Sequence, residues 1–194
     1  MFWSRIVIDF KPHLKLAHAL WKDLVKPGAT LIDATCGNGH DTCALAKLKP
    51  SQLFALDIQE EAVRKTEKNL KILLDSSDFE KIRFIASCHS HFPPTIFPRS
   101  VQLIVYNLGY LPGGDKELVT QVETTLLSIQ KALDLVSCDG AISITCYPGH
   151  PEGEKEEQAL LTFFRSLSPK KWNCLYHQWV NRPKSPSLFF IRPV

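Results

Sequence analysis

The sequence predicts an α/β fold in which a mostly parallel sheet of seven strands is covered by helices on both faces and closes with an antiparallel hairpin. Three observations support this prediction. Short apolar segments alternate with amphipathic helical patterns over five units, as in folds built from consecutive strand–helix units. A glycine-rich turn follows the first apolar segment. The last two apolar segments are joined by a short link, which is typical of antiparallel strands.

The strands and helices can be placed in chain order from their apolar patterns. The strands are expected at residues 31–32, 52–56, 82–86, 101–106, 141–146, 172–180 and 187–191. The helices are expected at residues 12–25, from about 40, and at 60–74, 116–136 and 152–167. A turn at Cys138-Asp139-Gly140 is expected to lead into the fifth strand. We find no repeat, low-complexity tract or boundary, so residues 1–194 are expected to form one domain.

Two of these helices have well-defined apolar faces. In helix 12–25 the residues expected to be buried are Leu14, Ala17, Leu20 and Leu24. In helix 60–74 they are Ala62, Val63, Leu70 and Leu73. The opposite face of the first helix carries Lys11, Lys15, His18 and Lys22. Such a charged face is usually solvated, and contact with RNA is the alternative.

The composition is that of a soluble globular protein, with 44% apolar and 22% charged residues. The net charge of +3 is too small to indicate a nucleic-acid partner by itself. The six cysteines form no Cys-x-x-Cys pair, so we expect reduced core thiols in a cytoplasmic protein. No apolar run approaches the roughly 18 residues of a membrane span, and Asp9 interrupts the apolar start that a signal peptide would need.

The stretch TLIDATCGNGHDT at residues 30–42 has the order strand, glycine-rich turn, helix. Glycines at positions 37 and 39 permit a sharp turn close to a ligand, and the first N–H groups of the helix face the same space. A dinucleotide motif would have a third glycine where this chain has Thr42, so that match is partial. Asp33, which precedes Gly37, favours S-adenosylmethionine, because a carboxylate suits a cationic cofactor without phosphates. The alternative is an ordinary turn.

A second acid, Asp57, ends the second strand. At this position in doubly wound nucleotide folds an acid binds ribose hydroxyls, and the alternative is that it caps the next helix. His89 lies in the loop after the third strand, which is expected to border the adenine. His89 and His91 lack a third ligand, so we predict no metal site. The predicted cofactor-binding residues are Asp33, Thr35, Gly37, Asn38, Gly39, Asp41, Thr42, Asp57, Ile58, Gln59, His89 and Asn107.

The fourth strand runs directly into the segment NLGYLPGGDK, which begins at Asn107. This segment lies at the carboxyl end of a strand, where open α/β sheets bind ligands. Its Asn107-x-x-Tyr110 pattern looks like a variant of the Asn-Pro-Pro-Tyr loop of amino-group methyltransferases, and the alternative is a turn with a capping asparagine. The fifth strand ends in a similar way at YPGHPEGEKE, with Tyr147, Gly149 and His150.

Three stretches carry a family resemblance: DATCGNGHDT at 33–42, YNLGYLPGGDK at 106–116 and YPGHPEGEKE at 147–156. Together they resemble the bacterial YtqB/MnmM-type family, which has a Rossmann-like class I methyltransferase fold. The resemblance implies S-adenosylmethionine-dependent methylation of the exocyclic amine of 5-aminomethyl-2-thiouridine at the tRNA wobble position, giving the 5-methylaminomethyl form. The implied partner is the tRNA anticodon loop, and a homodimer is left open. The chain departs from the family pattern at Cys36 and in the loop NRPKSPSLFF.

Methyl transfer to an amine requires the neutral amine to be held in line with the sulfonium. We expect the side-chain oxygen of Asn107 and the carbonyl of Leu108 to accept hydrogen bonds from the amine, and the ring of Tyr110 to lie against it. Asp115 or His150 is expected to take the remaining proton. Lys170, Lys171, Arg182 and Lys184 are candidates for phosphate contacts.

Three other functions are compatible with the same sequence. The first is a methyltransferase that acts on rRNA or on a small-molecule amine. The second is an NAD-dependent oxidoreductase, which Thr42 and the Asn107 loop disfavour. The third is a binding module without catalysis, which would not need Asp57 and Asn107 at the ends of strands.

Overall fold

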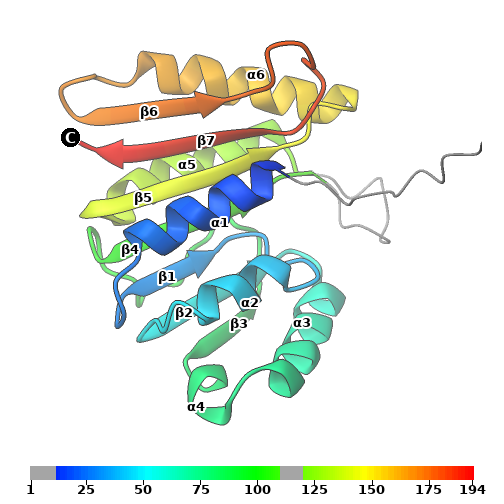
Figure 1. Ribbon diagram of the computed structural model, residues 1–194, viewed down its shortest axis with the longest axis vertical. Coiled ribbons are helices and arrows are strands. Elements are labelled where there is room, and N and C mark those ends of the chain that lie inside the picture. The colour runs from blue at the N-terminus through cyan, green and yellow to red at the C-terminus, as the bar shows by residue number, and fades with distance from the viewer. Residues whose placement is uncertain (1–11, 110–119) are drawn as a thin grey trace, which may run out of the picture.

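The computed structural model describes residues 12–109 and 120–194, so Tyr110 and Asp115 lie outside the described residues. In the described part, seven strands form one sheet in the order β3-β2-β1-β4-β5-β7-β6 (Figure 1). They are β1 (Thr30–Asp33), β2 (Gln52–Asp57), β3 (Ile82–Ala86), β4 (Val101–Asn107), β5 (Val136–Cys146), β6 (Trp172–His177) and β7 (Ser187–Pro193). The predicted fold is confirmed, because β1 to β5 pair in parallel and β7 runs antiparallel to β5 and β6.

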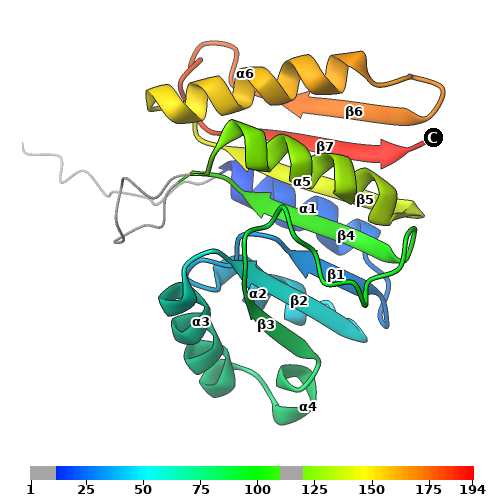
Figure 2. The ribbon, with the colours of Figure 1, turned by 180° about the vertical axis from the view of Figure 1, so that it is seen from behind.

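Helices cover both faces of this sheet. They are α1 (Pro12–Leu24), α2 (His40–Ala46), α3 (Glu60–Leu73), α4 (Ser76–Phe79), α5 (Val122–Leu135) and α6 (Pro151–Ser166). Apolar side chains of α1, α2 and α3 form one core with the sheet, and those of α5 and α6 form a second core on the other face (Figure 2). In β1 the neighbours Leu31 and Ile32 belong to different cores, as the alternation of side chains along a strand requires.

Helix α1 has the predicted bounds within one residue but buries a different face. The buried residues are His13, Ala17 and Trp21, whereas Leu14, Leu20 and Leu24 are only partly buried. Trp21 is one of the largest fully enclosed side chains of the protein, and burying it contributes more than burying a leucine. The helix is therefore rotated toward His13 and Trp21, and the leucines lie at the margins of the contact.

Helix α3 follows the prediction except at its last turn. Ala62, Val63 and Leu70 are buried, but Leu73 is 67% exposed. The chain leaves the helical conformation at Leu74, which has φ −111° and ψ 151°. This change of direction lets Leu74, which is partly buried, pack against the core in place of Leu73.

Strand β5 begins at Val136, so the turn predicted at residues 138–140 is wrong. The pairing with β4 shifts between Val101, which is opposite Val136, and Leu103, which is opposite Ala141. The chain therefore bulges within the strand instead of turning before it. Asp139 in the bulge accepts hydrogen bonds from Lys26 and Gln102, which fasten it to the neighbouring elements.

The cysteines are all unpaired, but they are not all core residues as expected. Cys36 and Cys146 are buried, whereas Cys138 and Cys174 are exposed. Among the described residues, no group of three histidine, cysteine or acidic side chains is arranged to hold a metal ion. None of the helices in the described ranges is long and apolar enough to cross a membrane.

Candidate active site

The candidate site lies at the sheet edge where the parallel strands end. Asp33, Asp57 and Asn107 are the last residues of β1, β2 and β4, and Tyr147 directly follows β5. Parallel strands bring their carboxyl ends to one edge, which is where α/β sheets bind ligands. Three hydrogen bonds tie the first three residues to the same turn, so the structure brings the predicted residues together.

The glycine-rich turn is held against α3. Gly39 has φ +82°, a conformation that other residues adopt rarely, and a Cβ atom there would lie 2.8 Å from Cγ2 of Thr66. The hydroxyl of Thr66 donates to the carbonyl of Gly37 over 2.7 Å. Gly39 is therefore required by packing against a helix, in addition to any approach of a ligand.

Asp57 binds two backbone N–H groups at the end of β2. Its Oδ2 accepts from the N–H of Gly37 and its Oδ1 from that of Gln59, each over 2.9 Å. The second bond orders the chain just before α3. The capping alternative does not hold in its strict form, because the N-cap of α3 is Gln59 and no side chain caps it. The first bond occupies the Gly37 N–H, a group of the glycine turn that a pyrophosphate would need as a hydrogen-bond donor. Exposed Ile58 follows at the same edge.

Asp33 is 0% exposed, so its carboxylate is enclosed behind the turn. It accepts hydrogen bonds from the Thr42 hydroxyl over 2.6 Å and from the Thr35 N–H over 3.2 Å. Burial, with a smaller contribution from the charge of Asp41, raises its pKa to about 7. The sequence predicted direct contact with the cofactor, but in this structure Asp33 supports the turn from inside.

Asn107 is fixed by both its backbone and its side chain. Its N–H donates to the Thr35 hydroxyl over 2.7 Å, and its Nδ2 donates to Oδ2 of Asp41 over 3.0 Å. A carboxylate only accepts hydrogen bonds, so the NH2 group must face Asp41. The side-chain oxygen of Asn107 is consequently directed away from Asp41. The other oxygen of Asp41 accepts from Nε2 of His18 over 2.8 Å. The sequence predicted that His18 lies on a solvated face, but this contact ties it to the site.

Two further residues, His13 and Tyr147, complete this network, and the sequence missed the first of them. Their rings meet edge to face, with centroids 5.7 Å apart, and the Tyr147 hydroxyl lies 3.5 Å from Nε2 of His13. Burial and the charge of Asp41 raise the pKa of Tyr147 to about 12, while a hydrogen bond with Asn107 lowers it. Tyr147 was recognised as a strand-end residue. His13 had no signal in the sequence, because only the fold brings α1 beside β5.

Two histidines that were predicted to belong to the site, His150 and His89, instead make contacts that support the fold. Nδ1 of His150 accepts from the N–H of Gly153 over 3.1 Å and caps α6, so this lone pair is not free to take a proton. His89 is buried against Tyr106, and burial lowers its pKa to about 4. Its Nδ1 has no hydrogen-bond partner among the described residues. Both residues lie beyond the ends of strands, as predicted, but neither belongs to the Asp41–Asn107 network.

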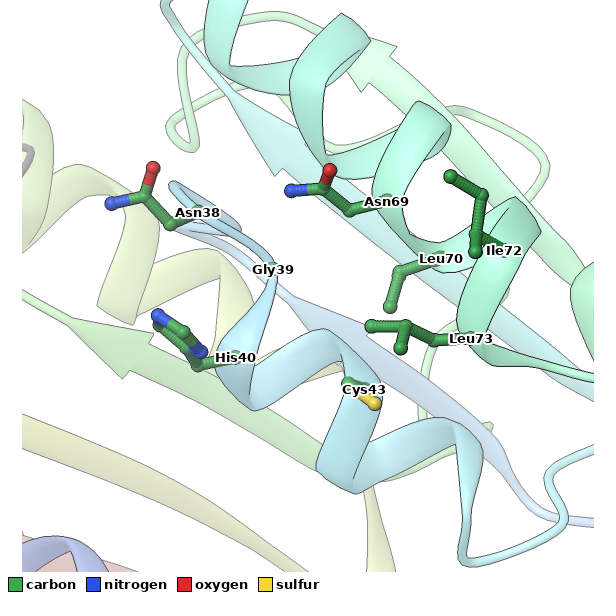
Figure 3. Close-up of a pocket in the computed structure, with 8 residues that line it drawn as sticks. All are labelled: Asn38, Gly39, His40, Cys43, Asn69, Leu70, Ile72 and Leu73. Carbon is green, nitrogen blue, oxygen red and sulfur yellow. The ribbon is translucent and has the colours of Figure 1, made fainter.

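A cavity of about 360 Å³ lies between α2 and α3, beside the glycine turn (Figure 3). It is lined by Asn38, Gly39, His40, Cys43, Asn69, Leu70, Ile72 and Leu73. None of Asp33, Asp57 and Asn107 lines it, so this cavity is not the candidate active site. Oδ1 of Asn38 accepts from Lys65 of α3, which turns this predicted cofactor residue toward that helix.

The side chains at the sheet edge fit S-adenosylmethionine. Asp33, Asp41 and Asp57 are close enough for the charges of the last two to raise the pKa of the first. Such a negative site attracts the sulfonium and ammonium groups of this cofactor and repels a pyrophosphate. The Gly37 amide is also already bound to a carboxylate.

The fold and this site define a class I S-adenosylmethionine-dependent methyltransferase. The chain belongs to the family described as "Putative rRNA methylase", whose model matches residues 53–192. The predicted family is thus confirmed.

Individual relatives agree with this assignment. The "tRNA (mnm(5)s(2)U34)-methyltransferase, chloroplastic" of Arabidopsis thaliana is 34% identical over 189 residues, which are 93% of this chain and 69% of that protein. The crystal structure of a "putative rRNA-methylase" from Clostridium thermocellum has a TM-score of 0.88 and 33% identity, covering 96% of this chain and all of that one. The crystal structure of a "putative methyltransferase" from Streptococcus mutans in complex with S-adenosylhomocysteine (SAH) has a TM-score of 0.82 and 29% identity, covering 95% of this chain and 99% of that one. S-adenosylmethionine is therefore the cofactor.

Proposed function

We propose that the protein methylates the exocyclic amine of 5-aminomethyl-2-thiouridine at the wobble position of tRNA, giving the 5-methylaminomethyl form. The name of the Arabidopsis relative supports this substrate. The observation that carries the chemistry is the orientation of Asn107. Its NH2 group is held by Asp41, so its oxygen can accept a hydrogen bond from an amine.

Two acceptors are needed because a neutral primary amine has two N–H groups and one lone pair. The Asn107 oxygen and the Leu108 carbonyl would each take one N–H, which leaves the lone pair to attack. When bound, S-adenosylmethionine supplies an electrophilic methyl group on its sulfonium. The chain's own residues hold the amine in line with it, and such positioning is a major source of rate enhancement. Tyr110 and Tyr147 would enclose the amine with ring surfaces.

The methylated amine must then lose a proton. His150 and Asp115 are the candidate acceptors, and Asp115 lies outside the described residues. Protonation of His150 at Nδ1 would break its bond to the Gly153 N–H and uncap α6. We therefore favour Asp115 in this role.

The surface that would meet the anticodon loop is narrower than the sequence suggested. Arg182 and Lys184 lie between β6 and β7, beyond Ser187, which pairs with the last residue of β5 at the site edge. Lys170 and Lys171 precede Trp172, which pairs with Pro193 at the opposite edge. Of these two pairs, the first lies at the edge of the site, which supports it as the pair that would bind phosphates of an RNA entering the site. The wobble base lies in a single-stranded loop, so it can enter a pocket at little cost.

The proposal is tested with the purified protein, labelled S-adenosylmethionine and tRNA that carries the free aminomethyl group. Transfer of label and a nucleoside heavier by one methyl group are expected in mass spectrometry. Absence of transfer to this tRNA would overturn the proposed substrate.

The family's description favours rRNA as a second candidate substrate. Ribosomal RNA and small primary amines therefore form parallel arms of the same assay. Label on either, with none on the tRNA, would assign the activity there.

A further inference from the structure

Helix α6 buries two consecutive acids that the mechanism above does not use. Glu156 is 3% exposed and Glu157 is 2% exposed. Burial raises the pKa of both. A buried carboxyl group is costly unless its oxygens are hydrogen-bonded, so each must have a compensating contact. Glu157 accepts from the Ser187 hydroxyl at the start of β7.

Glu156 is bound by two threonine hydroxyls. Its Oε1 accepts from Thr125 of α5 over 2.6 Å, and its Oε2 accepts from Thr120 over 2.7 Å. The hydrogen bond from Thr125 joins α5 to α6. Thr120 has a different place, because it is the first described residue after the segment 110–119.

Thr120 is also bonded to Gly109, the last described residue before that segment. The Gly109 N–H donates to the Thr120 hydroxyl over 3.0 Å, and the Thr120 N–H donates to the Gly109 carbonyl over 3.1 Å. These two bonds join the ends of the segment in a neck, which we define as Gly109 and Thr120. Gly109 has φ +128°, so a residue with a side chain would be strained there.

We propose that Glu156 is a positioning residue for methyl transfer, which acts through Thr120 to fix the neck. The Thr120 hydroxyl has one proton. Because the Thr120 hydroxyl donates its proton in a hydrogen bond to Oε2 of Glu156, a lone pair of the hydroxyl oxygen is available to accept from the Gly109 N–H. Gly109 follows Leu108 and Asn107 directly, so a displaced neck moves the groups that hold the acceptor. The inference rests on the proposed role of these two residues but not on the identity of the substrate.

A purely structural role for Glu156 makes a different prediction, and the two threonines separate the two roles. Thr120→Val and Thr125→Val each remove one hydroxyl from the same carboxylate at equal volume. Only the first removes the acceptor of the Gly109 N–H. Thr120→Ser keeps the hydroxyl and is the rescue variant.

The experiment measures kcat and KM with the acceptor that the wild-type protein methylates, S-adenosylmethionine affinity by calorimetry, and thermal midpoints. Thr120→Val is expected to lower kcat by about 10- to 100-fold, as misplacement of reacting groups does, with cofactor affinity within about threefold of wild type. Thr120→Ser and Thr125→Val are expected to keep kcat within about threefold. If Thr120→Val does not fold, Thr120→Ala, compared with Thr125→Ala, removes the same hydroxyls and decides by the same criteria.

Equal losses of kcat in Thr120→Val and Thr125→Val would overturn the proposal, as would wild-type kcat in Thr120→Val. A kcat loss matched by lost cofactor affinity would also overturn it. The proposed substrate fails separately, because that failure appears in the wild-type protein as methylation of rRNA or of a small amine instead of the tRNA.

Discussion

Asp33 is an acid in a position where its ionisation is costly. Its carboxyl group is enclosed, and the neighbouring charges of Asp41 and Asp57 oppose its own. The two hydrogen bonds from Thr42 and Thr35 only partly offset these effects, so the pKa rises from 3.8 to about 7. A folded protein that holds this proton more tightly than the unfolded chain is stabilised where the proton is bound.

The first prediction concerns the pH dependence of stability. The contribution of Asp33 is fully present below pH 4 and is lost as the pH rises to about 7, with a span of at most about 4 kcal/mol. Asp33→Asn removes this titration. The unfolding free energy of wild type minus that of the variant, measured in urea, should therefore fall between pH 4 and 7 and then level off. Parallel curves would contradict the assignment.

Asn107 and Asp57 should have opposite kinetic signatures. Asn107→Ala removes the acceptor of the amine, so kcat should fall by about 100-fold while calorimetry shows unchanged cofactor affinity. Asp57→Ala removes the partner of the Gly37 and Gln59 N–H groups and should weaken cofactor binding. Unchanged kcat in the first variant would remove Asn107 from the chemistry.

At the scale of elements, the glycine turn is a packed joint between α2 and α3. A Cβ atom at residue 39 would meet Thr66 Cγ2, while the Thr66 hydroxyl holds Gly37. Serine at position 66 would keep this hydroxyl and remove the clashing methyl group. The cost of the clash with the Thr66 methyl group can thus be measured separately from the cost of the positive φ at residue 39.

We predict that Gly39→Ala lowers the unfolding free energy by about 2 kcal/mol or more in the wild-type background, from the clash and from the positive φ together. In a Thr66→Ser background the cost should fall, because the 2.8 Å contact with Cγ2 is gone. The strain of the left-handed conformation, about 1 kcal/mol, and the tighter contacts with Oγ1 at 3.0 Å and Cβ at 3.3 Å remain. Chemical denaturation of the four proteins in this cycle measures the coupling. Strictly additive effects would show that the methyl group is not what excludes a side chain at residue 39.

At the scale of the whole molecule, the sequence predicted what depends on local pattern. The strand ends at Asp33, Asp57 and Asn107 follow from apolar runs that stop at a polar residue, and parallel order then brings them to one edge. The face that α1 buries was not predictable, because Trp21 and the leucines compete for the core.

Contacts between distant residues were also beyond the sequence. Asp41 and Asn107 are 66 positions apart, and Thr120 and Glu156 are 36 apart. The first pair forms because the sheet order places β1, which leads into α2, beside β4. The second pair forms because β4, which precedes Thr120, lies beside β5, which leads into α6. The buried role of Glu156 was hidden for a further reason, since a glutamate in the run EGEKEE has the appearance of a solvated helix start.

The sheet topology separates two pairs of cations that look equivalent in the sequence, and this gives a prediction for tRNA binding. Arg182 and Lys184 lie at the site edge, and Lys170 and Lys171 lie at the far edge. Each phosphate contact with single-stranded RNA releases a counterion and adds roughly 0.7 to the slope of log affinity against log salt concentration. Arg182→Ala with Lys184→Ala should therefore weaken binding and lower that slope by about 1.4. The matched pair Lys170→Ala with Lys171→Ala changes the net charge equally and should leave the slope unchanged. Equal slopes in the two double variants, measured by titration of tRNA at several salt concentrations, would mean that the RNA responds to total charge and not to the loop between β6 and β7.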